Sequence, residues 1–408
     1  MYESEPMAIT LTDVEAAAQR LAGHLIKTPF TQSQTLSAQL RCELFIKFEN
    51  QQFTASFKER GALNSLLKNP AAVAGGVTAM SAGNHAQALA YHGTRLGIPT
   101  TIVMPRTTPN AKVEATRMLG AEVILQGSTF DETLQFTKDL AQQRGITLIH
   151  PFDEPDVIAG QGTVALEMLA QVKDLDVIVV PIGGGGLISG IATVVKSVAP
   201  QIQVVGVQME RFANAYAAFH KQPQANVSHG FTVAEGIAVK APGVLTSAII
   251  NDLVDDIQLV SEQMVEQAIF DLLEIEKTVA EGAGAAGLAL VRNQPAAFRG
   301  KRVGMLVCGG NIDMMILSSV LQRGLVRSHR LVRLEIEIPD TPGALANLTT
   351  LLGDLDSNIV DISHQRAFGG SSVRATLVEL VLQMRGEEQK DNVTQVLEAQ
   401  GYDVRPIN

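Results

Sequence analysis

The stretch LDVIVVPIGGGGLISG, residues 175–190, joins an apolar run, four consecutive glycines and the start of an apolar helix. The run 175–182 is apolar on both faces, as in the central strand of a parallel sheet. Successive glycines let the backbone approach an anion and point N–H groups at it, and a helix N-terminus adds partial positive charge. A tight turn would need one or two glycines, not four. The stretch therefore predicts an α/β fold with a phosphate site after a buried strand.

The residues around the glycines indicate which class of phosphate ligand the loop could bind. A Walker loop requires Gly-Lys-Ser/Thr, whereas this chain has Gly186-Leu187-Ile188. The dinucleotide fingerprint GxGxxG fits only because glycine fills so many positions, and residues 204–208 offer no acidic partner for a ribose. Nucleoside phosphates are therefore disfavoured, and a nucleotide-dependent oxidoreductase is the weakest hypothesis for this chain.

Outward from this stretch, apolar runs typical of strands alternate with amphipathic runs typical of helices, beginning near Gly76. This alternation predicts βαβ units and a parallel sheet. Strands are predicted at 98–105, 121–127, 146–151 and 175–182, and helices at 110–120, 128–145 and 156–172.

The C-terminal tail has a different pattern, which begins after a short charged connection at 323–329. Its order is strand, helix, strand, strand, helix, strand, and such a βαββαβ order is typical of a ferredoxin-like unit. We place the boundary near Arg327, with a catalytic domain at 7–325 and a second domain at 329–408. The six elements are predicted at 330–338, 341–355, 358–366, 371–384, 388–400 and 402–407.

Composition excludes several classes of protein. The 408 residues are 46% hydrophobic, which is enough for a large core and more than one domain. A net charge of -10 without a Lys/Arg cluster disfavours nucleic-acid and anionic-membrane partners. Two distant cysteines suggest neither a disulfide framework nor a zinc site. The acidic N-terminus lacks a signal peptide's apolar segment, and no apolar run could span a membrane, so we expect a cytoplasmic protein.

Three further polar stretches follow or precede predicted elements. TASFKERGA, residues 54–62, places Lys58 beside Phe57 among small residues. SAGNHAQALA, residues 81–90, brings hydrogen-bonding side chains to a strand-to-helix turn, although a helix N-cap explains them equally well. LVCGGNIDM, residues 306–314, puts Cys308 at a strand end, where a cysteine usually serves only packing.

Together, a candidate nucleophilic lysine and a glycine-rich phosphate site without nucleotide features fit pyridoxal phosphate. That cofactor needs a lysine for its Schiff base, an anion site for one phosphate and a partner for its ring nitrogen. We therefore expect Lys58 to hold the cofactor and Phe57 to lie against its ring.

TASFKERGA, SAGNHAQ, GGGGL and CGGN, in this order, resemble the threonine dehydratase and serine racemase group of pyridoxal-phosphate enzymes. The resemblance extends to about residue 325 and implies fold type II, with two open α/β subdomains. DTPGALANLTTLL, residues 340–352, resembles an ACT domain. The combination is similar to the shorter threonine ammonia-lyases that carry one such regulatory domain.

The resemblance implies a role for each matching residue. Lys58 would be the Schiff-base lysine and proton carrier, Asn84 would contact the ring hydroxyl, and Cys308 would replace the serine or cysteine that faces the pyridine nitrogen. The phosphate would lie at Gly183, Gly184, Gly185, Gly186 and Leu187, and the substrate carboxylate at Ser81, Gly83 and His85.

These roles imply a β-elimination. The freed Lys58 removes the Cα proton as a base. A neutral thiol at Cys308 would not keep the ring nitrogen protonated, so the β-hydroxyl is expelled promptly and elimination is favoured over transamination. The released enamine hydrolyses in water to ammonia and a 2-oxo acid, which is 2-oxobutanoate if the substrate is threonine.

Two departures from the family pattern are informative. Racemising members have two serines before Gly-Asn-His, whereas here Ala82 follows Ser81, so the second hydroxyl for reprotonation is missing. Members that bind a divalent metal have acidic residues where this chain has Gln208 and Asn214. We therefore predict neither racemase activity nor a magnesium or manganese site. For a site that binds a monovalent cation, the sequence makes no prediction.

The leading hypothesis is an L-threonine ammonia-lyase, with serine or threo-3-hydroxyaspartate dehydration as the alternative. An amino-acid sensor without catalysis is a hypothesis from another class, which an intact Lys58 and a complete glycine loop disfavour. In the ACT family the turn at residues 339–347 lies beside an amino-acid effector, here a branched-chain amino acid such as isoleucine. A small domain with an exposed sheet edge is expected to pair, so we predict a homodimer or homotetramer.

Overall fold

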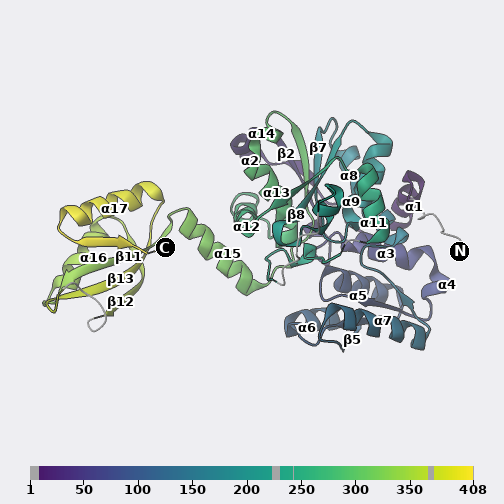
Figure 1. Cartoon of the computed structure of the whole chain (residues 1–408), viewed down its shortest axis with the longest axis horizontal. Helices are drawn as coiled ribbons and strands as arrows, with labels where there is room; N and C mark the ends of the chain where they lie inside the picture. The colour runs from purple at the N-terminus through teal and green to yellow at the C-terminus, as the bar shows by residue number, and fades with distance from the viewer. Residues whose placement is uncertain (1–8, 223–229, 242, 366–371, 408) are drawn as a thin grey trace. The chain divides into compact units, whose positions relative to one another are not determined.

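The protein is described from a computed structural model covering residues 9–222, 230–241, 243–365 and 372–407. It divides into two compact units, Met1–Asp313 and Met314–Asn408, which are described separately (Figure 1). Of the predicted domains, residues 7 and 8, 223–229, 242, 366–371 and 408 lie outside the described residues.

The first unit contains two sheets. In the larger sheet the order is β1-β2-β10-β7-β8-β9, and every pair is parallel except β1 with β2. In the smaller sheet the order is β5-β4-β3-β6, and all pairs are parallel. The strands are β1 (Phe30–Gln32), β2 (Glu43–Phe48), β3 (Val77–Met80), β4 (Thr100–Met104), β5 (Glu122–Leu125), β6 (Thr147–Leu148), β7 (Val177–Pro181), β8 (Gln203–Met209), β9 (Asp256–Val260) and β10 (Arg302–Val307).

Helices cover both faces of the larger sheet, with α12 and α13 on one side and α8, α9 and α11 on the other (Figure 1). The predicted alternation of strands and helices is confirmed, and β7 is buried along its whole length, as a central parallel strand should be. The helices are α1 (Leu11–Leu21), α2 (Gln34–Leu40), α3 (Lys58–Lys68), α4 (Pro70–Val73), α5 (Asn84–Leu96), α6 (Asn110–Met118), α7 (Phe130–Arg144), α8 (Pro155–Gln171), α9 (Gly186–Val198), α10 (Asn214–Phe219), α11 (Val244–Leu253), α12 (Glu262–Glu276), α13 (Gly282–Asn293) and α14 (Pro295–Phe298), with the 3-10 turns η1 (Glu49–Gln51), η2 (Glu210–Phe212) and η3 (Glu235–Ile237).

Glycines set the distance between α3 and α8. A Cβ added at Gly160 of α8 would lie 2.7 Å from the Cα of Gly61 in α3, so no larger residue fits between the two backbones. Because α3 begins at Lys58, this contact lies within the first turn of the helix that carries the lysine.

The second unit begins with α15 (Met314–Arg327) and continues with β11 (Leu331–Pro339), α16 (Ala344–Asp354), β12 (Asn358–Gln365), β13 (Ala375–Gln383), α17 (Glu387–Ala399) and β14 (Asp403–Pro406). Its antiparallel sheet has the order β12-β13-β11-β14. The predicted βαββαβ order is present, and one sheet face packs on the two helices through residues such as Leu334, Leu348 and Leu380. The expected connection at 323–329 is wrong in part, because Val320 and Gly324 are buried and the helix continues to Arg327.

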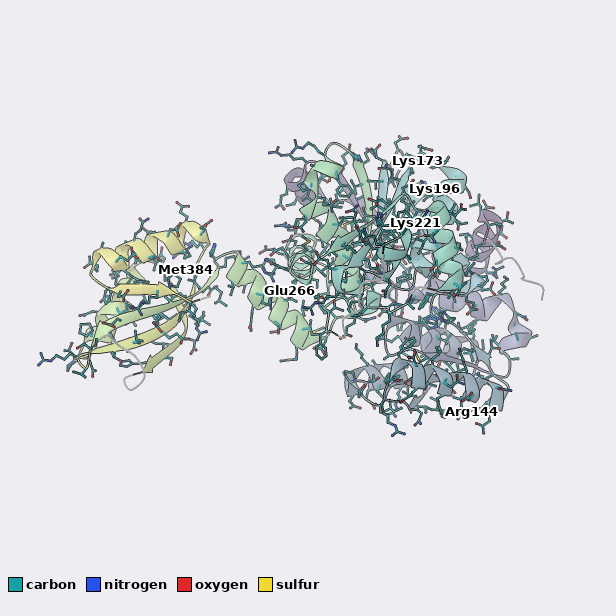
Figure 2. All side chains as sticks on the ribbon, viewed as in Figure 1. Arg144, Lys173, Lys196, Lys221, Glu266 and Met384 are labelled. Carbon is teal, nitrogen blue, oxygen red and sulfur yellow. The ribbon has the colours of Figure 1, made fainter. Side chains whose placement is uncertain are left out.

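Charged side chains lie on the surface of the first unit. Figure 2 labels Arg144 and Lys173, which are both exposed, and Arg144 forms an ion pair with Glu122 at 2.6 Å. Among the described residues, no helix combines the length and apolar character that a membrane crossing requires.

Candidate active site

Four segments that are far apart in the sequence are linked in the first unit by hydrogen bonds and packing contacts, and the glycine loop is linked through residues 151–153. They are the start of α3, the start of α5 after β3, the glycine loop after β7, and the segment after β10 that begins at Cys308. The carboxyl ends of parallel strands are the usual place for ligands in α/β proteins. The polar stretches noted in the sequence thus come together at one candidate site.

Lys58 is the first residue of α3, and it is held from the opposite side of the site. Its Nζ donates a hydrogen bond to the carbonyl of Pro151 at 2.7 Å and lies 5.2 Å from the centre of the Phe57 ring. Burial lowers the pKa of Lys58 to about 8, although Cys308 and Glu281 act in the opposite direction. A cation at a helix N-terminus is also unfavourable. A neutral, nucleophilic amine is therefore accessible near neutral pH.

The loop before Lys58 pairs with the segment after β10. The N–H of Phe57 donates to the carbonyl of Cys308 at 3.0 Å, and the N–H of Gly310 donates to the carbonyl of Ala55 at 2.9 Å. Cys308 is 2% exposed, and burial raises the pKa of its thiol well above the ordinary value. The site therefore contains a neutral thiol close to the lysine.

Asn84 links α5 to this segment and to Glu281, which the sequence analysis missed. The Nδ2 of Asn84 donates to Glu281 Oε1 at 2.7 Å, and the Nδ2 of Asn311 donates to Asn84 Oδ1 at 2.8 Å. Burial raises the pKa of Glu281 to about 7, although the bond from Asn84 lowers it. A Cβ at Gly309 would lie 2.3 Å from Glu281 Oε1, so a larger residue there would displace the carboxylate. A glutamate before the glycine- and alanine-rich start of α13 is the local signal that could have identified Glu281.

The glycine loop offers backbone donors. Gly185 has a φ of 93°, in the left-handed region that glycine tolerates, and no side chain caps α9. Within the described part of the chain, no backbone acceptor is bonded to the N–H groups of Gly183, Gly184 or Gly185. The first N–H groups of a helix also lack internal partners. This cradle of free donors fits one phosphate group.

The segment from Pro151 to Asp153, also missed in the sequence, connects Lys58 to the glycine loop. A Cβ at Gly184 would lie 2.2 Å from Cγ of the Phe152 ring, so the ring packs directly on the loop. Asp153 accepts hydrogen bonds from the N–H groups of Val244 and Thr246, and the Thr246 hydroxyl donates to the carbonyl of Gly184 at 2.7 Å. Pro151 accepts a hydrogen bond from Lys58, and the next two residues, Phe152 and Asp153, support the glycine loop.

The remaining residues of the SAGNHAQ stretch lie at the start of α5. Ser81 Oγ accepts from the N–H of Gly83 at 3.3 Å, and no side chain caps the helix. His85 is 2% exposed, and burial lowers its pKa to about 3. Its Nε2 lies 3.3 Å from the carbonyl of Ile149, which requires a donor, so the neutral ring carries its proton on Nε2. The side chain of His85 supports the turn, and no side chain caps the first N–H groups of α5.

The two residues that replace acidic metal ligands are bonded within the protein. Gln208 Oε1 accepts from the N–H of Tyr216 at 3.0 Å, and Asn214 Nδ2 donates to the carbonyls of Val239 and Lys240. In the described residues, no three His, Cys, Asp or Glu side chains gather as a cation site.

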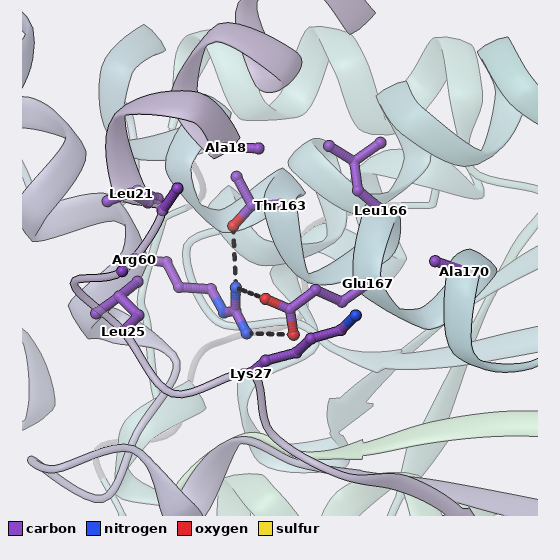
Figure 3. Close-up of a pocket in the computed structure, with 11 residues that line it drawn as sticks. Ala18, Leu21, Leu25, Lys27, Arg60, Thr163, Leu166, Glu167 and Ala170 are labelled. Carbon is purple, nitrogen blue, oxygen red and sulfur yellow. Dashed lines mark hydrogen bonds and ion pairs between the residues drawn. The ribbon is translucent and has the colours of Figure 1, made fainter.

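A separate pocket of about 380 Å³ lies between α1 and α8 (Figure 3). The Arg60 guanidinium lines it and forms ion pairs with Glu49 at 2.7 Å and Glu167 at 2.8 Å. The positive charge of Arg60 is therefore neutralised within the protein. Lys58 does not line this pocket, so it is distinct from the site around the lysine.

Comparison with known proteins identifies the family of the chain. The family model described as "Pyridoxal-phosphate dependent enzyme" matches residues 21–309. The chain is 41% identical to an L-threonine ammonia-lyase of Thermotoga maritima, over 98% of this chain and 100% of the relative. It is 42% identical to an L-threonine ammonia-lyase of Geobacter sulfurreducens, over 96% and 98%. The solved structure of threonine deaminase isoform 2 from Solanum lycopersicum, in its processed form, matches with a TM-score of 0.71 and 33% identity, over 79% of this chain and 93% of that one.

Proposed function

The chain belongs to the family of pyridoxal-phosphate-dependent enzymes, and from this premise we propose that it is an L-threonine ammonia-lyase. Its products are 2-oxobutanoate and ammonia. The observation that carries the proposal is Lys58, an amine of lowered pKa that Pro151 holds beside a glycine loop and a buried thiol.

The residues around Lys58 fit the cofactor. Lys58 Nζ would hold its aldehyde group, and Phe57, whose ring centre lies 5.2 Å from Nζ, would pack beside the cofactor. The free N–H groups of Gly183, Gly184 and Gly185, with Gly186 and Leu187 at the start of α9, bind the phosphate. Asn84 would contact the ring hydroxyl, and Cys308 would be the partner of the ring nitrogen. When bound, pyridoxal phosphate withdraws electrons from the substrate Cα and makes its proton acidic.

Lys58 then acts as the base at Cα. The carbonyl of Pro151 can only accept a hydrogen bond, so it directs an Nζ–H towards itself and fixes the position of the amine. Because burial lowers the pKa of Lys58 to about 8, a useful fraction of the amine is neutral at pH 7 and remains basic enough to take a proton. A buried lysine is therefore better suited to this role than an exposed one.

The start of α5 binds the substrate carboxylate. Ser81 and Gly83 form the turn, and the first N–H groups of the helix, including that of His85, offer donors to an anion without a competing cap. The neutral imidazole of His85 holds the turn to the carbonyl of Ile149. Binding one carboxylate here orients the Cα proton towards Lys58.

Cys308 favours elimination over racemisation and transamination. Burial keeps its thiol neutral, so it could donate at most a weak hydrogen bond and, unlike a carboxylate, would not keep the ring nitrogen of a bound cofactor protonated. Ala82 has no hydroxyl to return a proton from the opposite face. The β-hydroxyl therefore leaves before Cα is reprotonated.

The choice among β-hydroxy amino acids is tested by measuring 2-oxo acid release from L-threonine, L-serine and threo-3-hydroxyaspartate. We expect the highest kcat/KM with L-threonine, because the relatives of similar length are L-threonine ammonia-lyases. A higher kcat/KM with serine or 3-hydroxyaspartate would favour the alternative substrate. Turnover of none of the three would contradict the enzyme proposal and favour an amino-acid sensor.

For the second unit we propose an ACT domain at residues 329–408 that binds a branched-chain amino acid, and for the catalytic domain the range 7–325. Gly343 precedes α16 with a φ of 88°, and no atom lies within 4 Å of an added Cβ, so a ligand can approach its backbone.

Strand β12 lies at the sheet edge and exposes Val360 and Ile362. Pairing of such edges supports a homodimer or homotetramer. Two buried, unpaired cysteines fit a reducing cytoplasm.

A further inference from the structure

The side-chain amide of Asn84 is bonded on both sides within the protein, and this limits what it can offer a ligand. Its oxygen accepts from Asn311 Nδ2 at 2.8 Å, and its nitrogen donates to Glu281 Oε1 at 2.7 Å. An asparagine amide can reverse its oxygen and nitrogen by rotation, so its direction depends on its partners.

The direction is determined by a backbone carbonyl. The carbonyl of Thr54 has no proton, so the group of Asn311 that lies 2.8 Å from it must be the NH2 group. The second hydrogen of that NH2 group points at Asn84, and the facing atom of Asn84 must be its oxygen. The nitrogen of Asn84 then faces Glu281, whose carboxylate accepts.

Thr54 is itself held firmly. Glu59 Oε1 accepts from both the N–H and the hydroxyl of Thr54, at 2.5 Å and 3.0 Å, and Glu59 Oε2 lies 3.0 Å from Nε2 of the buried His92. Glu59 follows Lys58 directly in the sequence. The same bonds therefore fix the loop before the lysine and, through Asn311, the amide of Asn84.

One N–H of Asn84 remains after these bonds are counted. We propose that Asn311 and Glu281 are positioning residues, which hold the Asn84 amide so that it offers the cofactor an N–H donor and not its oxygen. The inference rests on the proposed function, which places the cofactor's ring hydroxyl at Asn84.

The consequence concerns the charge of that hydroxyl. A donor hydrogen bond stabilises the ionised form, whereas an acceptor stabilises the protonated form. An amide fixed in the observed direction therefore lowers the pKa of the bound ring hydroxyl. An amide free to reverse would lose this effect and would also bind the cofactor less tightly.

The test is a double-mutant cycle in the full-length protein with Asn311→Ala, Glu281→Gln and the double variant. The Asn311→Ala change removes the donor that faces the Asn84 oxygen. The Glu281→Gln change replaces a carboxylate that only accepts with an amide that can donate or accept. Each single variant keeps one bond that fixes the direction of the Asn84 amide, and only the double variant keeps neither. The readouts are the pH midpoint of the bound cofactor's absorbance and the affinity for pyridoxal phosphate. Asn50→Ala, combined with Glu281→Gln, is a matched control, because Asn50 donates two hydrogen bonds to Thr278 and Val279 and none to Asn84.

We expect the double variant to bind the cofactor roughly tenfold more weakly than the two single effects predict together, and its absorbance midpoint to rise by about one pH unit. The control pair should be additive. Additive single effects, or an unchanged midpoint, would overturn the proposal. If the alanine double variant does not fold, Asn311→Ser with Glu281→Gln is judged by the same two outcomes.

The readouts use the cofactor alone, so they separate this inference from the proposed function. Wild-type protein that binds pyridoxal phosphate but does not deaminate threonine contradicts only the function. Wild-type protein that deaminates threonine, with an additive cycle, contradicts only the positioning role.

Discussion

Replacing Lys58 by methionine should stabilise the cofactor-free protein at neutral pH. In the folded chain, burial lowers the pKa of Lys58 from 10.5 to about 8. Below pH 8 the amine is protonated in both states, and the folded protein bears the full cost of the buried charge. Between pH 8 and 10.5 the unfolded chain binds a proton that the folded chain does not, so the free energy of unfolding rises with pH.

The magnitude follows from the lowered pKa. One pKa unit corresponds to about 1.36 kcal/mol, so a lowering of about 2.5 units corresponds to roughly 3 kcal/mol. The residue Lys58 keeps some exposure to solvent although burial dominates its pKa, and it donates a hydrogen bond to Pro151, which methionine cannot do. After these two reductions we expect Lys58→Met to raise the free energy of unfolding by about 2 kcal/mol at pH 7.

The assay is denaturant unfolding of the cofactor-free protein at several pH values. The advantage of Lys58→Met over wild type should be largest below pH 8 and should shrink as the pH rises towards 10. Lys173→Met, at an exposed lysine, is the matched control and should show no such trend. If the difference in the free energy of unfolding between Lys58→Met and wild type stays constant across this range, the argument that a buried charge on Lys58 destabilises the folded protein is refuted.

Three other substitutions or deletions test the rest of the site and the tail. Gly184→Ala should weaken pyridoxal-phosphate binding roughly tenfold or more through overlap with the Phe152 ring, and Phe152→Ala should restore part of it in a cofactor titration; equal weakening with and without the second change would argue against the contact. Cys308→Asp should keep the ring nitrogen protonated and raise the share of transamination or racemisation, so an unchanged product ratio would speak against Cys308 as its partner. Deletion of residues 329–408 should abolish any effect of isoleucine or valine on the threonine saturation curve, while cofactor binding remains. If these amino acids have no effect on the full-length enzyme either, the tail serves assembly and not regulation.

Local patterns were sufficient for the elements of the fold. The apolar run before the glycines, the alternation from Gly76 and the βαββαβ tail each depend on neighbouring residues, and the structure has these elements in the predicted order. The division of the first unit into two sheets could not be predicted from these local patterns, and only the family resemblance implied two α/β subdomains. In the chain, β3 is the next strand after β2, with η1, α3 and α4 between them. Nevertheless β3 pairs with β4 and β6 in the smaller sheet and not with β2.

The site was predictable only where a residue stands in a local pattern. Lys58, Asn84 and Cys308 were found because small residues and glycines surround them. Glu281 and Pro151 were not, because their partners lie 197 and 93 residues away along the chain. Their importance comes from burial and from which carbonyl or amide they face, and these follow from packing between distant segments.

The central claim is that Lys58 holds the cofactor and carries out threonine deamination. The most direct test measures the absorbance of bound pyridoxal phosphate and the release of 2-oxobutanoate and ammonia from L-threonine in wild type, Lys58→Ala and the surface control Lys173→Ala. Wild type and Lys173→Ala should be yellow and should release the two products in equal amounts. Lys58→Ala should lose both the colour and the activity, and full activity in Lys58→Ala would contradict the account.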